Sequence, residues 1–350
     1  MNFVALVSGF RVKPPALLIM IAISEHRLQT LFKEIRDLKV LVLGDLMLDQ
    51  YHWGGVTRIS PEAPVPVVEI ESESERLGGA VNVCCNIAEL GATAIPIGIV
   101  GDDPAGKTLL RMLKESGFST QGVIIDEARS TTVKTRVIAH NQHVVRIDKE
   151  TKHEINRSVQ QEILEIFFNQ AQNAQAILIE DYNKGLLTKS LISEIVDYCK
   201  NNGKILTVDP KFTNFFEYRN VTLFKPNRKE TEEVLGVRLK SLEQISAAGN
   251  ILIQRLQCEN VLITLGEKGM LLFERSGEMT EVPVKARKIH DVSGAGDTVI
   301  STVTVALAAE ATVKEAATLA NYAAGIVCGE VGIVPIAKNK LMQAVLGKSE

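Results

Sequence analysis

The chain has 350 residues, of which 45% are hydrophobic and 23% are charged. These proportions are typical of a folded globular protein with a large core, and they exclude wholesale disorder. The formal net charge of −3 lacks the basic excess of proteins that bind mainly to phosphate backbones, so we expect no nucleic-acid partner. The length allows either two domains or one large α/β domain.

Two features of the sequence bear on where the protein resides. The apolar run 16–23 is far shorter than the roughly 20 residues that span a bilayer, so we expect no membrane partner. We interpret this N-terminal region as a disordered extension, or else the natural chain starts at Met20 and the residues before it are not translated. The five cysteines are scattered without a CxxC pair, which favours a reduced, cytoplasmic protein with neither a disulfide framework nor a zinc site.

From residue 39 onward, short apolar runs alternate with segments of helical periodicity. The runs are 40–43, 95–100, 176–179, 205–208, 223–224 and 261–264, and the helical segments are 80–90, 105–115, 156–172, 190–201 and 242–255. This alternation predicts an α/β fold with a mostly parallel central sheet and helices on both faces. A hairpin is expected at 269–273 and 279–284. We expect one domain over 38–340, preceded by an extension and first helix at 1–37 and followed by a tail at 341–350.

Two segments break this rhythm. The first, 51–77, contains three prolines and the alternating stretch 66–71, and the second, 130–148, contains two strand-like stretches joined across Asn141 and Gln142. Both are typical of antiparallel strands that leave the main sheet. Together they predict a small β-sheet lid, which could also be a dimer surface because exposed strand edges tend to be paired.

The residues that follow the apolar runs are candidates for a ligand site, because open α/β sheets bind ligands at the carboxyl ends of their strands. They are Gly44, Asp45 and Asp49, then 180–184, 209–211 and 225–230, and then Gly266 and Gly269. Carboxylates, lysines and glycines at one edge favour a phosphate-bearing ligand with a divalent cation.

Residues 101–108 match the pattern GxxxxGK(S/T), which would make the protein a P-loop NTPase using Lys107. Such a loop aims backbone N–H groups at a polyanion. Asp102 and Asp103 would place negative charge inside that nest, and Pro104 lacks an N–H. These three residues favour an ordinary helix start instead.

Residues 290–298 bring small residues to the start of a predicted helix. The backbone N–H groups of Gly294, Ala295 and Gly296 could stabilise charge on a transferred phosphoryl group. Asp297 could accept the proton of an attacking hydroxyl. The alternative is a tight loop in which Asp297 only caps the helix.

Two further motifs also allow a functional and a purely structural interpretation. Asn227 and Glu230, three residues apart, suit Mg²⁺ held through waters, or simply begin a helix. Gly78 and Gly79 could form a hinge, with Asn82 binding a sugar hydroxyl, or the stretch is a plain turn into a helix.

Taken together, these motifs resemble the ribokinase-like (PfkB) family of carbohydrate kinases. Residues 78–82 are similar to its N-terminal signature and 291–297 to its C-terminal signature, in the right order within 39–337. The resemblance implies a ribokinase-like fold with a β-sheet lid, and ATP with Mg²⁺ as cofactors. A monovalent cation near Asp291 and the chain after Asn321 is also implied, as in some relatives.

A closer similarity is to the D-glycero-β-D-manno-heptose-7-phosphate kinase branch. The residues that carry it are 44–51, 58–67, 141–148, 181–185 and 226–230. The branch implies phosphorylation of the anomeric O1 to give the 1,7-bisphosphate, a step toward ADP-heptose for the lipopolysaccharide core. Because the chain ends at Glu350 and contains no HxGH motif, we expect a stand-alone kinase without a nucleotidyltransferase domain.

The resemblance also implies a role for each motif. Asp297 would be the base, and Gly294, Ala295 and Gly296 the anion hole. The nucleotide and its Mg²⁺ would contact Asn227, Arg228, Lys229, Glu230, Lys211, Thr264, Gly266, Gly269 and Asn321. The sugar phosphate would contact Asp49, Gly78, Gly79 and Asn82, with Arg136, Arg146 and Lys184 at its 7-phosphate. Glu230 and Asp291 would be metal ligands. Independently of the resemblance, we expect a homodimer through the lid, because exposed strand edges tend to be paired.

Three alternatives remain open at this point. The acceptor could be another sugar or a nucleoside, since the lid sets that choice. The chain could be the P-loop NTPase described above, or a non-catalytic sugar-nucleotide sensor, which the presence of Asp297 disfavours. An NAD-dependent dehydrogenase is disfavoured because residues 44–49 do not match GxGxxG.

Overall fold

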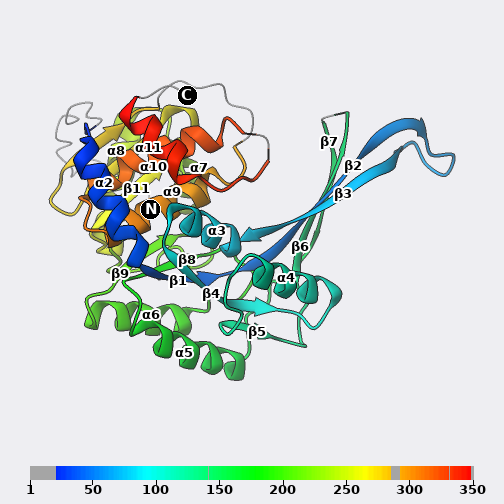
Figure 1. Ribbon diagram of the computed structural model, residues 1–350, viewed down its shortest axis with the longest axis horizontal. Helices are drawn as coiled ribbons and strands as arrows, with labels where there is room; N and C mark the ends of the chain where they lie inside the picture. The colour runs from blue at the N-terminus through cyan, green and yellow to red at the C-terminus, as the bar shows by residue number, and fades with distance from the viewer. Residues whose placement is uncertain (1–20, 141, 285–291, 331, 348–350) are drawn as a thin grey trace.

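A computed structural model describes residues 21–140, 142–284, 292–330 and 332–347 of the chain (Figure 1). Its centre is a nine-stranded sheet in the order β13-β12-β11-β10-β9-β8-β1-β4-β5. The strands are β1 (Lys39–Gly44), β4 (Thr93–Val100), β5 (Val123–Ile125), β8 (Ala176–Glu180), β9 (Ile205–Asp209), β10 (Leu223–Phe224), β11 (Asn260–Thr264), β12 (Met270–Glu274) and β13 (Met279–Val282). Pairing is parallel from β5 to β11, and the β12–β13 hairpin is antiparallel, as the sequence predicts.

Helices cover both faces of this sheet, because its strands are apolar on both sides. Along β1, Val40 and Val42 join one core while Leu41 and Leu43 join the other. The first core is covered by α2 (Glu25–Glu34), α3 (Ala80–Leu90), α4 (Pro104–Glu115), α9 (Ala295–Ala308), α10 (Val313–Val327) and α11 (Lys338–Leu346). The second is covered by α5 (Arg157–Ala171), α6 (Lys189–Asn201), α7 (Arg228–Leu235) and α8 (Leu242–Leu256). The predicted layered α/β fold is confirmed.

The helices at the two ends of the described chain are part of the core. In α2, Leu28 and Leu31 are fully buried, and a short 3-10 helix, Ile35–Asp37, connects α2 to β1. In α11, Leu341 is fully buried, and this helix runs across the domain end expected at residue 340. In the part of the chain that is described, no helix is long and apolar enough to cross a membrane.

A second sheet forms the lid and projects from the α/β body as a long ribbon (Figure 1). It has the order β3-β2-β6-β7, with β2 (Leu46–Ile59), β3 (Pro66–Gly79), β6 (Thr132–Ala139) and β7 (Gln142–Lys149). The predicted lid is therefore confirmed, with two corrections. Its two hairpins join through a parallel pair, β2–β6. Its first strand begins at Leu46 rather than Tyr51, because Leu46, Met47 and Leu48 are buried against the main core.

Candidate active site

The carboxyl ends of four neighbouring parallel strands meet at one edge of the main sheet. Glu180, the last residue of β8, is in register with Gly44 of β1 and Asp209 of β9, and Lys225 follows β10. The first turn of α9 faces this edge: a Cβ on Gly296 would lie 3.5 Å from Lys225 Nζ. The polar residues that follow separate strands are thus brought together, as predicted.

The carboxylate of Asp297 is held from two sides. Asn82 Nδ2, from α3, donates to Asp297 Oδ2 at 2.6 Å, and the Tyr182 hydroxyl, from the loop after β8, donates to Oδ1 at 3.1 Å. Burial raises the pKa of Asp297 and nearby Asp209 adds to this, while the Asn82 hydrogen bond opposes it. A fixed carboxylate with a raised pKa is well suited to accept a proton. Asn82, predicted to bind a sugar hydroxyl, donates to this carboxylate, and its contact with sugar stays a prediction.

The predicted anion hole lies at the start of α9, next to Asp297. Gly294 has a left-handed φ of +78°, and Thr298 N donates to its carbonyl at 2.9 Å in the first helical hydrogen bond. Amides before that bond have no acceptor within the helix and point out of its N-terminus. The Ala295 amide donates to Val292 O at 3.3 Å. The amides of Gly296 and Asp297 have no acceptor within the helix, and the anion hole of Gly294, Ala295 and Gly296 stays a prediction.

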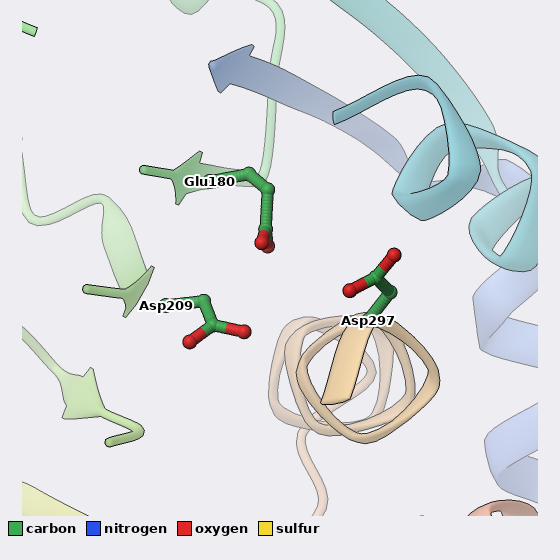
Figure 2. Close-up of side chains that lie close together, drawn as sticks. All are labelled: Glu180, Asp209 and Asp297. Carbon is green, nitrogen blue, oxygen red and sulfur yellow. The ribbon is translucent and has the colours of Figure 1, made fainter. Parts of the chain in front are cut away.

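Three buried carboxylates, Glu180, Asp209 and Asp297, offer oxygens that lie within 4.8 Å of one another (Figure 2). Asp209 Oδ2 pairs with Lys225 Nζ at 2.7 Å. Neither oxygen of Glu180 has a hydrogen-bond partner within the described residues, although only 1% of Glu180 is exposed. Burial, together with Asp209 and Asp297, raises the pKa of Glu180 well above its usual range. An orphaned buried carboxylate beside a second one fits a divalent cation.

The Asn227–Glu230 motif begins α7 with a reciprocal capping box. Asn227 Oδ1 accepts from the Glu230 amide at 2.9 Å, and Glu230 Oε2 accepts from the Asn227 amide at 2.8 Å. Lys211 Nζ pairs with the other Glu230 oxygen at 2.5 Å. Burial acts against the charge of Lys211, yet Asp209 and Glu230 raise its pKa overall. Both Glu230 oxygens therefore have protein donors, unlike those of Glu180.

The other residues predicted to bind the nucleotide lie at the end of β11, in the turn that follows it, and on α10. Thr264 ends β11, and its amide donates to Pro226 O at 3.1 Å, beside the start of α7. Gly266 and Gly269 bound a short 3-10 turn, with the Gly269 amide donating to Gly266 O at 3.0 Å. Asn321, on α10, donates to Pro283 O at 2.7 Å, after β13. Arg228 and Lys229 are exposed in the first turn of α7, and Asp291 lies outside the described residues.

The predicted sugar residues line the inner end of the lid. Asp49 is buried within β2, and Arg136 Nη1 pairs with its Oδ1 at 2.5 Å. A Cβ on Gly78 would overlap Asp49 Oδ2, and Gly79 has a φ of +58° at the entry to α3. Steric overlap at Gly78 and the positive φ of Gly79 both favour glycine, whether or not the pair acts as a hinge.

The three cations predicted at the 7-phosphate are each paired with a different carboxylate. Arg136 pairs with Asp49, and its guanidinium lies 5.1 Å from the Tyr51 ring centroid. Arg146, more than half exposed, pairs with Asp148 at 2.9 Å. Lys184 pairs with Glu150 at 2.5 Å. Each already has a carboxylate partner.

The prediction gave no role to two residues that build the site, Tyr182 and Asp45. The carboxylate Oδ2 of Asp45 accepts from the amides of Tyr182 at 2.8 Å and Lys184 at 3.2 Å, which fixes the loop after β8. Burial and the nearby Asp181 raise the pKa of Asp45 to about 7. The sequence does show that both residues follow a predicted strand. It does not show which group each side chain contacts.

The GxxxxGK(S/T) match lies at the start of α4. Asp103 caps that helix: its Oδ1 accepts from the Gly106 amide at 2.8 Å and its Oδ2 from the Thr131 amide at 3.1 Å. Lys107 is largely exposed and pairs with Asp102 at 3.1 Å. The helix N-terminus is occupied by its own carboxylate, which favours the helix-start interpretation.

Comparison with solved structures supports the same fold. Phosphofructokinase-2 from Escherichia coli, in a complex with potassium, matches with a TM-score of 0.74 at 18% identity, over 89% of this chain and 99% of that one. Arabidopsis thaliana ribokinase complexed with ribose and ATP matches with a TM-score of 0.70 at 19% identity, over 88% and 98% of the two chains. These likenesses establish the ribokinase-like fold.

Comparison with curated sequences identifies nearer relatives. Bifunctional protein HldE from Desulfatibacillum aliphaticivorans is 45% identical over 87% of this chain and 62% of its own length. Bifunctional protein HldE from Helicobacter pylori strain J99 is 42% identical over 84% and 63%. This chain therefore spans less than two thirds of the length of these relatives. The family described as pfkB family carbohydrate kinase matches residues 37–339, so the chain belongs to the pfkB family of carbohydrate kinases.

Proposed function

We propose that this protein transfers the γ-phosphoryl group of ATP to O1 of D-glycero-β-D-manno-heptose 7-phosphate. The product, the 1,7-bisphosphate, would feed ADP-heptose synthesis for the lipopolysaccharide core. The observation that carries the proposal is the buried Asp297 carboxylate at the N-terminus of α9, oriented by Asn82 and Tyr182. The choice of acceptor is supported by the HldE relatives at 40–45% identity and by the branch-like motifs in the sequence.

In this reaction Asp297 accepts the proton of the attacking hydroxyl. Asn82 and Tyr182 keep one carboxylate oxygen each in place, so the carboxylate does not need to reorient during the proton transfer. The amides of Gly296 and Asp297, with the positive end of the α9 dipole, stabilise charge on the transferred phosphoryl group. Binding and positioning account for most of the catalysis of phosphoryl transfer.

The proposed cofactors are ATP and Mg²⁺. Glu180 and Asp209 would hold the cation, since Asp297 and Glu230 already have protein donors on both oxygens. When bound, Mg²⁺ offsets the charge of the nucleotide phosphates. Lys211 would lie near the transferred group, and a monovalent cation toward Asp291 stays a proposal.

The protein is further proposed to be cytoplasmic and to form a homodimer through the lid. Support for the dimer comes from large apolar side chains that are exposed on the lid strands. They are Ile59, Ile70, Val145 and Ile147, between 45% and 61% exposed. Covering such a surface by a second copy would remove apolar area from water.

The acceptor is tested with a panel of sugars and sugar phosphates, measuring ATP-dependent turnover of each. We expect heptose 7-phosphate to have the highest kcat/KM. The second candidate is a pfkB kinase for another sugar or a nucleoside. Turnover of ribose without turnover of heptose 7-phosphate would refute the branch assignment while leaving the family membership intact.

A further inference from the structure

One cation at the inner end of the lid differs from all those considered above. Lys134 lies on β6, and no carboxylate among the described residues is within salt-bridge distance of its ammonium group. Its Nζ is 5.2 Å from the centroid of the Tyr182 ring. The Tyr182 hydroxyl donates to Asp297, so the ammonium group and the proposed base contact the same tyrosine.

The surroundings of Lys134 are unfavourable to its charge. Burial lowers the pKa of Lys134 overall; the charges of Asp49 and Asp148 raise it, and those of Lys184 and Arg146 lower it. Asp49 is itself bound to Arg136. The ammonium group is therefore half-buried at the edge of the active site, and no carboxylate among the described residues forms a salt bridge with it. A group in that position gains stability from an incoming anion.

The neighbouring cations are less available to an anion. Arg136, Arg146 and Lys184 would each have to leave or share a carboxylate that lies within 2.9 Å. Lys134 has no such pair to break among the residues that the structure describes. Lys211, at 5.3 Å from the same Tyr182 ring, is paired with Glu230 on the nucleotide side of the site.

We propose that Lys134 binds a phosphate monoester carried by the acceptor sugar at the end remote from the reacting hydroxyl. The inference rests on the proposed function and names the residue that recognises the 7-phosphate. A charge-assisted contact to Lys134 would place the phosphate over the face of Tyr182 while the reacting hydroxyl lies at Asp297. Lys184 and Arg146 contribute positive potential to the same site without leaving their own carboxylates.

The test compares Lys134→Met with wild type, using heptose 7-phosphate and the same heptose without phosphate. Methionine keeps the length of the side chain and removes its charge. We expect the KM for heptose 7-phosphate to rise about 10- to 100-fold, the range of a charged hydrogen bond. The KM for ATP and the kcat/KM for the unphosphorylated heptose should stay the same.

Lys149→Met is the matched control, because Lys149 lies on the adjacent lid strand β7, is exposed, and pairs with Asp103. It makes the same change of charge on the same sheet, and we expect all three constants to be unchanged. If Lys134→Met does not fold, Lys134→Gln replaces it, with the melting temperature measured for each variant.

An equal loss of kcat/KM with both sugars would overturn the inference, because Lys134 would then act through Tyr182 or the fold. An unchanged KM for the sugar phosphate would overturn it as well. If wild type does not use heptose 7-phosphate, the proposed function is refuted, but the role of Lys134 is not. The same comparison is then made with the best phosphorylated acceptor of the panel. A wild type that prefers unphosphorylated acceptors throughout would refute the phosphate site.

Discussion

At the residue scale, the proposed chemistry depends on how the carboxylate of Asp297 is held. The sequence alone was enough to predict a candidate site at Asp297, since small residues just before a helix with an acidic first turn form a local pattern. Tyr182 and Asn82 could not be predicted as its partners, because they are 115 and 215 residues away in the chain. Only the packing of α3, α9 and the loop after β8 brings these side chains together.

Tyr182→Phe removes the hydroxyl that donates to Asp297 Oδ1 and leaves the ring in place. We expect kcat to fall about 10-fold, the effect of one hydrogen bond to a charged group. Loss of a donor to the carboxylate also raises the Asp297 pKa, so the acidic limb of the kcat/KM–pH profile should move to higher pH.

Tyr218→Phe is the control for this prediction. Tyr218 is fully buried, and its hydroxyl donates to a different carboxylate, Asp181, at 2.7 Å. The substitution should lower the melting temperature and leave the acidic limb where it is. A limb that moves equally in both variants would show that the effect of Tyr182 is not specific to Asp297.

At the element scale, most strands and helices of the main sheet follow from local patterns. The helix predicted at 80–90 coincides with α3, and the two-residue strand at 223–224 coincides with β10. The start of the lid was the exception. The lid segment was predicted to begin at residue 51, but Asp49 already lies within β2, because the burial of Leu46 and Leu48 extends the strand back to the core.

Gly79→Ala tests the junction between β3 and α3. Gly79 has a φ of +58°, and a Cβ there would overlap the Asp45 carbonyl and Met47. We expect a loss of about 1–3 kcal/mol in the free energy of unfolding, measured by urea denaturation, from strain and steric overlap.

Gly325→Ala, within α10, is the matched control because a Cβ there meets no atom within 4 Å. It should leave the free energy of unfolding unchanged or raise it by up to about 1 kcal/mol through helix propensity. Equal effects of the two substitutions would contradict the steric argument for Gly79.

At the scale of the whole molecule, the lid both frames the active site and exposes apolar side chains to solvent. Its existence could be predicted from two interruptions of the βαβ rhythm. The parallel β2–β6 contact that joins the two hairpins could not, because no local pattern specifies which strand of one hairpin lies beside the other.

Ile147→Asp tests the proposed dimer through the lid. Ile147, on β7, is 57% exposed, and a carboxylate there would oppose burial against a second copy. We expect the wild type to sediment as a dimer and the variant as a monomer. Ile125→Asp on β5, at the edge of the main sheet, changes a residue that is 53% exposed and should leave the dimer intact. A wild-type monomer would refute the proposal.

The central claim is that Asp297, and not Lys107, carries the chemistry of this chain. The measurement is ATP turnover with heptose 7-phosphate by wild type, Asp297→Asn and Lys107→Ala. We predict that Asp297→Asn lowers kcat by about 10²- to 10⁴-fold, the usual effect of losing a general base. Lys107→Ala, which removes an exposed lysine paired with Asp102, should have nearly wild-type turnover. A loss of turnover in Lys107→Ala with activity retained in Asp297→Asn would contradict the account.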